Sequence, residues 1–578
     1  MPASFKTAPR AAACLLVAAS TAVTAAATAS TDSATLEQTL VNRNTTLNLI
    51  EALVERGILD RSSADSMIRD AREQAVKDAR TGIAKLQPAA PASSSPGSTV
   101  KDDAVHVYYI PQAMKDELRR DVQATLEKRV VAEVKTQAKA EKWGVPAALP
   151  DWVNRFTFSG DIRLRAEGVL FGEDNQPFSY LDFPTINARG GVNAAGLDAF
   201  ENTTVDRHRL RARLRLAIDS AVTEGLVAGV RLSTSNERSP VALNQDLGQY
   251  GQQYEVVIDR LYARYDWRDF DGFEWATLWA GRHENPWLST EALFDRDLSF
   301  EGLAGTFRLP LSDSDDDELE AGAALTNWGF SRAGSLFLTV GGFPLEEVEF
   351  STQDKWLLGG QTGVDWGFAD SSRFKLGVAY YDFIHVNARQ NALGSRALDF
   401  TAPQFFTRGN SLMRISNDVG ETLANPRLVG LAADFNVVDL TAAWDFARFD
   451  PFHVILTGSY SKNVGFDRSE ILGRSGQDIE AKTNAYEIRV DVGQQLLRRQ
   501  HDWNAGFGYR RVERDSVLDA YSHSLFHFGG TDAKGWMLNA SYSIARHTWL
   551  TARWLSTEAI DGPPLGIDTL LLDFNTDL

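Results

Sequence analysis

Nine arginines at even spacing along four successive stretches of the chain are its clearest chemical signal. A spacing of two places side chains on one face of a β-strand, so each stretch would direct its guanidinium groups to one side. Guanidinium groups stay charged at physiological pH and bind carboxylates and other anions through paired N–H donors. On neighbouring strands they would form a basic ladder that attracts and guides anions. The predicted ladder consists of Arg163, Arg165, Arg209, Arg211, Arg213, Arg215, Arg231, Arg260 and Arg264.

Two other interpretations of the arginines remain open. Carboxylates of Asp161, Asp219 and Asp259, or of acidic loops folded inward, could oppose the arginines across a water-filled space. A charge-paired interior without selectivity is the simpler alternative. A nucleic-acid surface is disfavoured because the formal net charge is −18 and because the apolar residues between the arginines need burial.

Other polar clusters carry less information. The run SDSDDDELE at 312–320 lacks the spacing and glycine of an EF-hand loop, so we expect a solvated loop. His523 and His527 have a spacing that suits a metal on a helix, but YSHSLFHFGG is typical of a loop or strand end. The chain has no HExxH, GxSxG or phosphate-binding glycine motif. We predict no catalytic residue, no metal and no cofactor.

The elements that must position the arginines are β-strands, because alternation of polar and apolar residues begins near residue 155 and continues to the end. In RHRLRARLRLAID, Leu210, Leu214 and Leu216 oppose Arg209, Arg211 and Arg213. Segments of this kind are about ten residues long, the length of a tilted strand that crosses a bilayer, and we count about sixteen to eighteen. Only a closed barrel satisfies every backbone group in lipid. We therefore predict a closed antiparallel transmembrane β-barrel over residues 151–578.

Further features fit this barrel. Aromatic residues near strand ends suit the membrane interfaces, and the long connections 171–206 and 386–427 are the candidates for a loop that constricts the lumen. Soluble β-sandwiches and propellers also alternate, but their inward faces could not tolerate so many unpaired charges. No segment has the run of apolar residues that a membrane-spanning helix needs. The expected interfacial residues are Tyr265, Trp267, Trp366, Tyr380, Trp444 and Trp554.

The first 150 residues have a different character. Residues 1–29 are typical of a signal peptide, with Lys6 and Arg10 before an apolar stretch, and the single cysteine, Cys14, lies in this region. Residues 30–86 predict a helical hairpin, 87–104 a Pro/Ser linker, and 105–150 a short strand followed by a charged helix. The apolar stripe of this helix wraps around it and forms no heptad seam, which favours an amphipathic helix lying on the barrel, with a coiled coil as the alternative. We expect this segment in the periplasm.

Three stretches resemble the putative porin family of Gram-negative outer membranes. They are VYYIP with the charged helix and WVNRFTFSGDIRLRAEG, then LVGLAADFNVVDLTAAWDFARFDPFHVILTGSYSKNVGFD, and TARWLSTEAIDGPPLGIDTLLLDFNTDL. The resemblance covers most of the chain and implies an outer-membrane barrel with a channel role, commonly a homotrimer. One departure is that the chain ends in Leu578, where such barrels commonly carry an aromatic residue, and Phe574 lies four positions earlier.

We therefore expect a porin, a passive diffusion channel for small hydrophilic solutes, with an anion preference supplied by the arginine ladder. Its other partners would be outer-membrane lipid and lipopolysaccharide. A structural protein that tethers the envelope, with the barrel as its anchor, is the alternative from another class. A barrel hydrolase is a further alternative, for which the sequence selects no residues.

Overall fold

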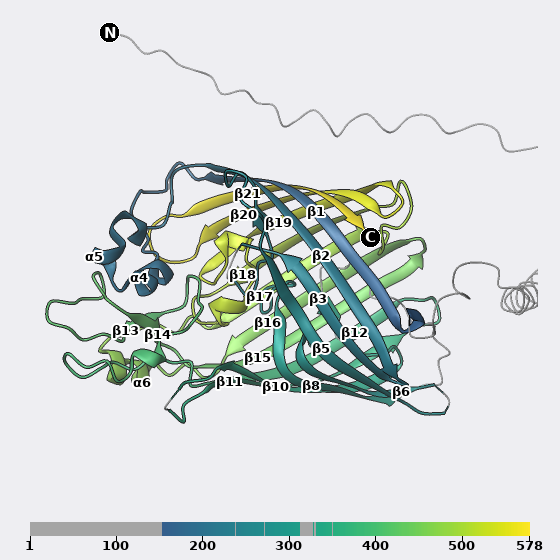
Figure 1. Cartoon of the computed structure of the whole chain (residues 1–578), viewed down its shortest axis with the longest axis horizontal. Helices are drawn as coiled ribbons and strands as arrows, with labels where there is room; N and C mark the ends of the chain where they lie inside the picture. The colour runs from purple at the N-terminus through teal and green to yellow at the C-terminus, as the bar shows by residue number, and fades with distance from the viewer. Residues whose placement is uncertain (1–152, 237–238, 271, 312–326, 329–330, 350) are drawn as a thin grey trace, which may run out of the picture. The chain divides into compact units, whose positions relative to one another are not determined.

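The computed structural model describes residues 153–578, except 237–238, 271, 312–326, 329–330 and 350 (Figure 1). The predicted signal peptide, helical hairpin, linker and charged helix of residues 1–150 lie outside the described residues. The acidic run 312–320 lies outside them as well.

Sixteen long strands make up the described structure, in agreement with the alternation in the sequence. The short strand β4 (Gln245–Asp246) is joined to β2. The sixteen strands are β1 (Phe156–Phe171), β2 (Arg207–Thr223), β3 (Leu226–Thr234), β5 (Val256–Arg268), β6 (Glu274–Glu284), β8 (Ser299–Pro310), β10 (Ser335–Glu346), β11 (Lys355–Gly367), β12 (Arg373–Ile384), β15 (Phe435–Phe449), β16 (Phe452–Asn463), β17 (Asn484–Gly493), β18 (Trp503–Val512), β19 (Ala533–Ala545), β20 (Thr548–Ala559) and β21 (Gly566–Asp577).

The sheet closes on itself. Each of these strands pairs antiparallel with the next one in the chain, and β1 also pairs with β21, for example through Leu164 opposite Phe574. Figure 1 shows this seam where the blue first strand lies beside the yellow last strands. Closure leaves no strand edge unpaired, which is the condition for strands in lipid, and it confirms the predicted barrel.

The two faces of the wall differ as the alternation predicts. Leu164, Leu210 and Leu216 are exposed on the outside, whereas Arg165 and Arg211 are buried on the inside. An apolar outer surface of this kind suits hydrocarbon. All six aromatic residues predicted for the membrane interfaces are exposed.

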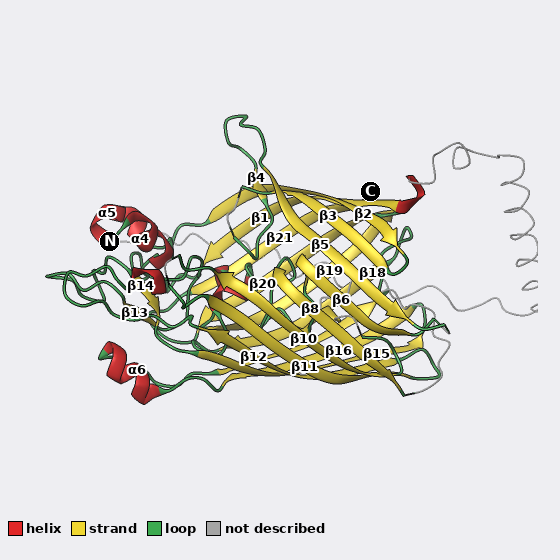
Figure 2. Ribbon diagram, turned by 60° about the horizontal axis from the view of Figure 1, so that its bottom comes forward, coloured by secondary structure: helices red, strands yellow, loops and turns green. Residues whose placement is uncertain are grey.

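The two ends of the barrel differ in their connections. At one end, called here the short-turn end, strands are joined by segments such as 224–225 and 546–547. The opposite, long-loop end carries 172–206, 385–434 and 513–532. Figure 2 shows the three α-helices at this end, whereas the 3-10 turn Val153–Arg155 lies at the opposite end. In the part of the chain that the structure describes, no helix combines the length and apolarity needed to cross a bilayer.

Small elements lie in the loops. They are the helices α4 (Phe183–Arg189), α5 (Val192–Ala195) and α6 (Arg468–Ser475), the 3-10 turns Val153–Arg155, Gly196–Ala199, Asp399–Thr401, Asp519–Tyr521 and Phe526–Phe528, and the strands β7 (Leu288–Ser289), β9 (Asn327–Trp328), β13 (Leu412–Arg414) and β14 (Val429–Leu431).

Candidate functional site

One loop of the long-loop end, 285–298 between β6 and β8, folds into the barrel. Its Trp287 and Leu293 are buried and belong to one cluster with Tyr381 on the inner face of β12. The rings of Trp287 and Tyr381 meet edge to face, with 5.3 Å between their centroids. Because Tyr380, the neighbour of Tyr381, is exposed on the outer face, the loop lies inside the wall.

Hydrogen bonds fix this loop at several points. The side chain of Gln361 on β11 accepts from the backbone N–H of Leu288 and donates to the carbonyl of the same residue, both at 2.8 Å. These paired bonds fix the backbone of the inserted loop to the barrel wall, in addition to the short pairing of β7 with β9. Further hydrogen bonds join Thr290 to Ser459, and Asp295 to Tyr521 and Ser524 of the loop 513–532.

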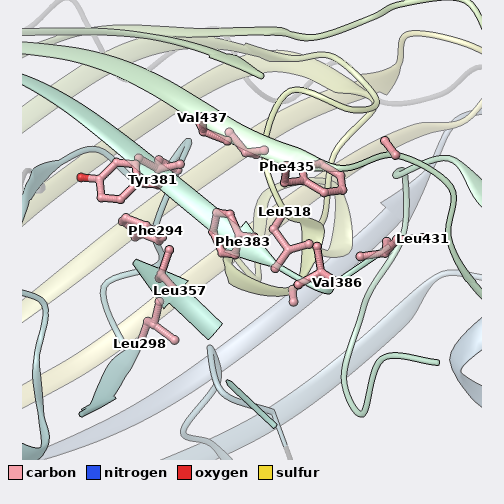
Figure 3. Packing of buried hydrophobic residues seen from close by; sticks show 14 of the residues in the cluster. Phe294, Leu298, Leu357, Tyr381, Phe383, Val386, Leu431, Phe435, Val437 and Leu518 are labelled. Carbon is pink, nitrogen blue, oxygen red and sulfur yellow. The ribbon is translucent and has the colours of Figure 1, made fainter. Parts of the chain in front are cut away.

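An apolar cluster occupies one side of the interior (Figure 3). Phe294 and Leu298 of the inserted loop belong to the same cluster as inner-face residues of β11, β12 and β15, and Leu518 and Leu431 come from other long loops. The sequence predicts a polar interior all round, and the structure differs here. Loops that fold inward carry apolar side chains into the lumen. The wall residues that face these side chains are apolar as well, because contact between the two sets removes both from water.

The other side of the interior is a charged cavity of about 920 Å³. Seven of the nine predicted arginines line it, whereas Arg209 and Arg211 lie outside its lining. Its charged residues are Arg163, Arg165, Arg213, Arg215, Arg231, Arg260, Arg264, Arg296, Arg498 and Arg553 with Asp161, Asp219, Glu284, Glu291, Asp295, Asp297 and Asp577.

The inserted loop touches the arginine wall directly. Asp297 lies 3.1 Å from Arg213 and 3.7 Å from Arg215. Asp161 on β1 binds the same two guanidinium groups, at 3.0 and 2.6 Å. Two carboxylates thus hold two arginines where the loop meets β2.

The remaining predicted arginines other than Arg163 pair with carboxylates of the barrel wall. Two of the predicted carboxylates, Asp161 and Asp259, pair with arginines beside them, and Asp219 accepts from the hydroxyl of Tyr262 at 2.7 Å. The carboxylates that face the wall come instead from the inserted loop, the second of the two sources considered from the sequence. The other pairs are Arg165 with Asp573, Arg209 with Glu167, Arg211 with Asp246 and Glu167, Arg260 with Glu284, and Arg264 with Asp266.

Some of the positive charge is not matched by an adjacent carboxylate. Arg163 donates to the neutral side chain of Asn244 at 2.7 Å. The Nε of Arg553 on β20 is buried and has no hydrogen-bond partner among the described residues. Since both line the cavity, they give part of its surface an excess of positive charge.

The loop carboxylates differ in their protonation. Burial, together with the charges of Asp297 and Glu291, raises the pKa of Asp295 above its usual range. Burial alone would raise the pKa of Asp297. The positive charges of Arg213, Arg163 and Arg215 have the larger effect together, so its pKa lies below the usual range. Burial lowers the pKa of His523 beside Glu291 to about 3, so this imidazole is neutral at physiological pH.

The inserted loop differs from the two connections predicted to enter the lumen, because that prediction rests on loop length alone. Neither 171–206 nor 386–427 contributes to the lining of the 920 Å³ cavity, although Met413 and Ile415 of the second are buried in the apolar cluster. A signal was present in NPWLSTEALFDRDLSF. Apolar residues such as Trp287 and Leu293 in a short connection predict burial, and this segment also carries three carboxylates.

The two histidines at helical spacing do not share a site. His523 lies 3.4 Å from Glu291, whereas the Nδ1 of His527 lies 3.1 Å from the hydroxyl of Thr557. The described residues contain no group of three or more His, Cys, Asp or Glu side chains arranged for a metal ion.

A closed barrel with an apolar outer face, a charged lumen and an inserted loop defines the porin class of outer-membrane channels. The model of the family described as "Putative porin" matches residues 43–578. The chain belongs to this porin family, as the resemblance in its sequence indicates.

Solved structures similar to this chain include Pseudomonas putida OprB at high pH, with 10% identity, coverage of 76% of this chain and 97% of that chain, and a TM-score of 0.40. The outer membrane channel DcaP of Acinetobacter baumannii has 12% identity, coverage of 73% and 97%, and a TM-score of 0.36. An anion-selective porin from Comamonas acidovorans has 10% identity, coverage of 73% and 99%, and a TM-score of 0.36. The comparison with curated proteins found no match to this chain.

Proposed function

We propose that this porin is a passive diffusion channel for small hydrophilic solutes and that it prefers anions. The observation that carries the proposal is the lining of the 920 Å³ cavity, in which ten arginines stand beside seven carboxylate side chains. Fixed charges of one sign raise the local concentration of solutes of the opposite sign and lower the barrier to their passage.

Arg163 and Arg553 are the residues we expect to act most strongly on a passing anion. Most other arginines of the lining have a carboxylate partner that cancels much of their field. Among the described residues, the side chain of Arg163 donates to the neutral side chain of Asn244, and the Nε of Arg553 has no hydrogen-bond partner. Both therefore keep donors and charge for a solute.

The proposed orientation of the barrel in the membrane follows from the lengths of the connections between its strands. Short turns face the periplasm in outer-membrane barrels, and long loops face outside. Because β1 begins at the short-turn end, the preceding residues 30–150 would lie in the periplasm. The homotrimer and the contacts with lipid and lipopolysaccharide stay predictions.

Reconstitution into planar bilayers under a KCl gradient tests the proposal. We expect discrete conductance steps and a reversal potential shifted toward the equilibrium potential of chloride. The double variant R163Q/R553Q should move the reversal potential toward zero while the steps remain. The matched control is R468Q, since the side chain of Arg468 on α6 is 56% exposed and outside the cavity lining, and it should behave as wild type.

The two parts of the proposal fail in different ways. A bilayer that stays sealed with correctly folded protein would reject the channel. Conductance steps with a reversal potential on the potassium side would reject the anion preference alone.

A further inference from the structure

A second cavity, of about 230 Å³, lies among the long loops and shares no lining residue with the charged cavity. Leu298 of the inserted loop, Leu357 of β11, and Leu431 and Leu518 of other loops form part of its wall (Figure 3). Glu301 also lines it, and its side chain is 59% exposed, which marks the side open to solvent. The cavity therefore reaches the surface of the protein beside Glu301.

The chemistry of this wall is unusual for a water-filled lumen. Four aromatic rings line the cavity, from Phe300, Phe343, Phe405 and Tyr521, beside the aliphatic residues already named. Cavities of roughly 150 Å³ lined by such residues hold a benzene ring. Aromatic rings also attract one another beyond the effect of burial alone, so this wall favours a flat ring over an aliphatic group of equal size.

One polar group in the cavity has no partner. The hydroxyl of Ser299, a residue only 5% exposed, makes no hydrogen bond among the described residues. A buried hydroxyl without a partner costs free energy that a ligand acceptor could recover. The two cations of the lining are already paired, Lys355 with Glu346 and Arg282 with Glu301. Ser299 is therefore the group we expect to receive the polar head of a ligand.

We infer that this cavity is a capture site for small aromatic carboxylates, which place the ring among the four aromatic side chains and the carboxylate at the hydroxyl of Ser299. The aromatic part of this inference stands on the cavity itself. The choice of a carboxylate rests on the proposed anion preference of the channel. Small apolar pockets with a few placed polar groups are the usual form of a specific site.

Benzoate is the probe, and cyclohexanecarboxylate and acetate are the comparison anions. Added on the long-loop side of a single channel, benzoate should interrupt the chloride current at concentrations where the other two do not. The variant A520L fills the cavity, since Ala520 lines it, and should weaken benzoate binding by about tenfold or more, as misfits of one or two methylenes do in fitted pockets. S299A should weaken it too.

The control is A397L, an exposed position in the loop 385–434 that lies outside the cavity lining, which should leave benzoate binding unchanged. Equal interruption by benzoate and cyclohexanecarboxylate, or an unchanged benzoate effect in both A520L and S299A, overturns the capture site while the chloride preference stands. Absence of chloride preference in the wild type instead overturns the anion preference, on which the choice of a carboxylate rests. Because S299A removes one buried oxygen and adds no volume, it decides the question even if A520L does not fold.

Discussion

At the scale of single residues, the charge of Asp295 is the feature most open to control by pH. Its raised pKa comes from burial and from the negative charges of Asp297 and Glu291. A carboxyl with a raised pKa takes up a proton as the pH falls toward it, and the lining then loses one negative charge. We predict that the anion preference of the channel increases between about pH 8 and about pH 5, a window in which ordinary carboxyls stay ionised.

Reversal potentials across this pH range measure the effect. The neighbours should not add to it, because the pKa of His523 is lowered to about 3 and that of Glu291 is lowered as well. D295N should show a smaller change in selectivity across this pH range than the wild type. A D295N channel with the same pH profile as the wild type would assign the titration to another group.

At the scale of elements, the inserted loop 285–298 occupies part of the lumen, and the side chain of Gln361 holds its backbone. Replacing this side chain by leucine leaves the buried N–H and carbonyl of Leu288 without partners, at about 1–3 kcal/mol for each group. The apolar cluster keeps the loop inside the barrel in this variant, but the loop backbone loses the two hydrogen bonds that fix it at Leu288. We predict that Q361L gives larger and noisier conductance steps than the wild type.

Single-channel recording checks this prediction, with Q249L as the matched control. Gln249 is exposed in the loop 235–255, and among the described residues its side chain makes no hydrogen bond to the inserted loop. Steps of wild-type size and noise in Q361L would show that packing around Trp287 suffices to position the loop.

At the scale of the whole molecule, stability depends on the seam where the first and last strands meet. Arg165 of β1 and Asp573 of β21 form a double hydrogen bond at 2.7 and 2.8 Å, and their side chains are 2% and 1% exposed. Removing one member of a buried pair costs about 3–5 kcal/mol, because the other charge stays buried alone. We predict that D573N lowers the temperature at which the barrel unfolds.

Loss of the compact band on a semi-native gel with heating measures this stability. The exchanged variant R165D/D573R should recover part of the loss, since the opposite charges remain adjacent across the seam. D478N, which breaks an exposed pair with Arg468, is the control and should unfold as the wild type does. Unfolding of D573N at the wild-type temperature would mean that water in the lumen solvates Arg165.

The period of two in the sequence determined the strands, their two faces and the closed barrel, because a strand's side chains alternate whatever its neighbours are. It also placed Arg163, Arg213 and Arg215 on the inner face. Only the tertiary structure decided that the segment 285–298 enters the lumen, that Asp297 meets these arginines, and that one side of the interior is apolar. Loop positions depend on contacts between residues distant in the chain, such as Gln361 with Leu288, and no local pattern encodes such contacts.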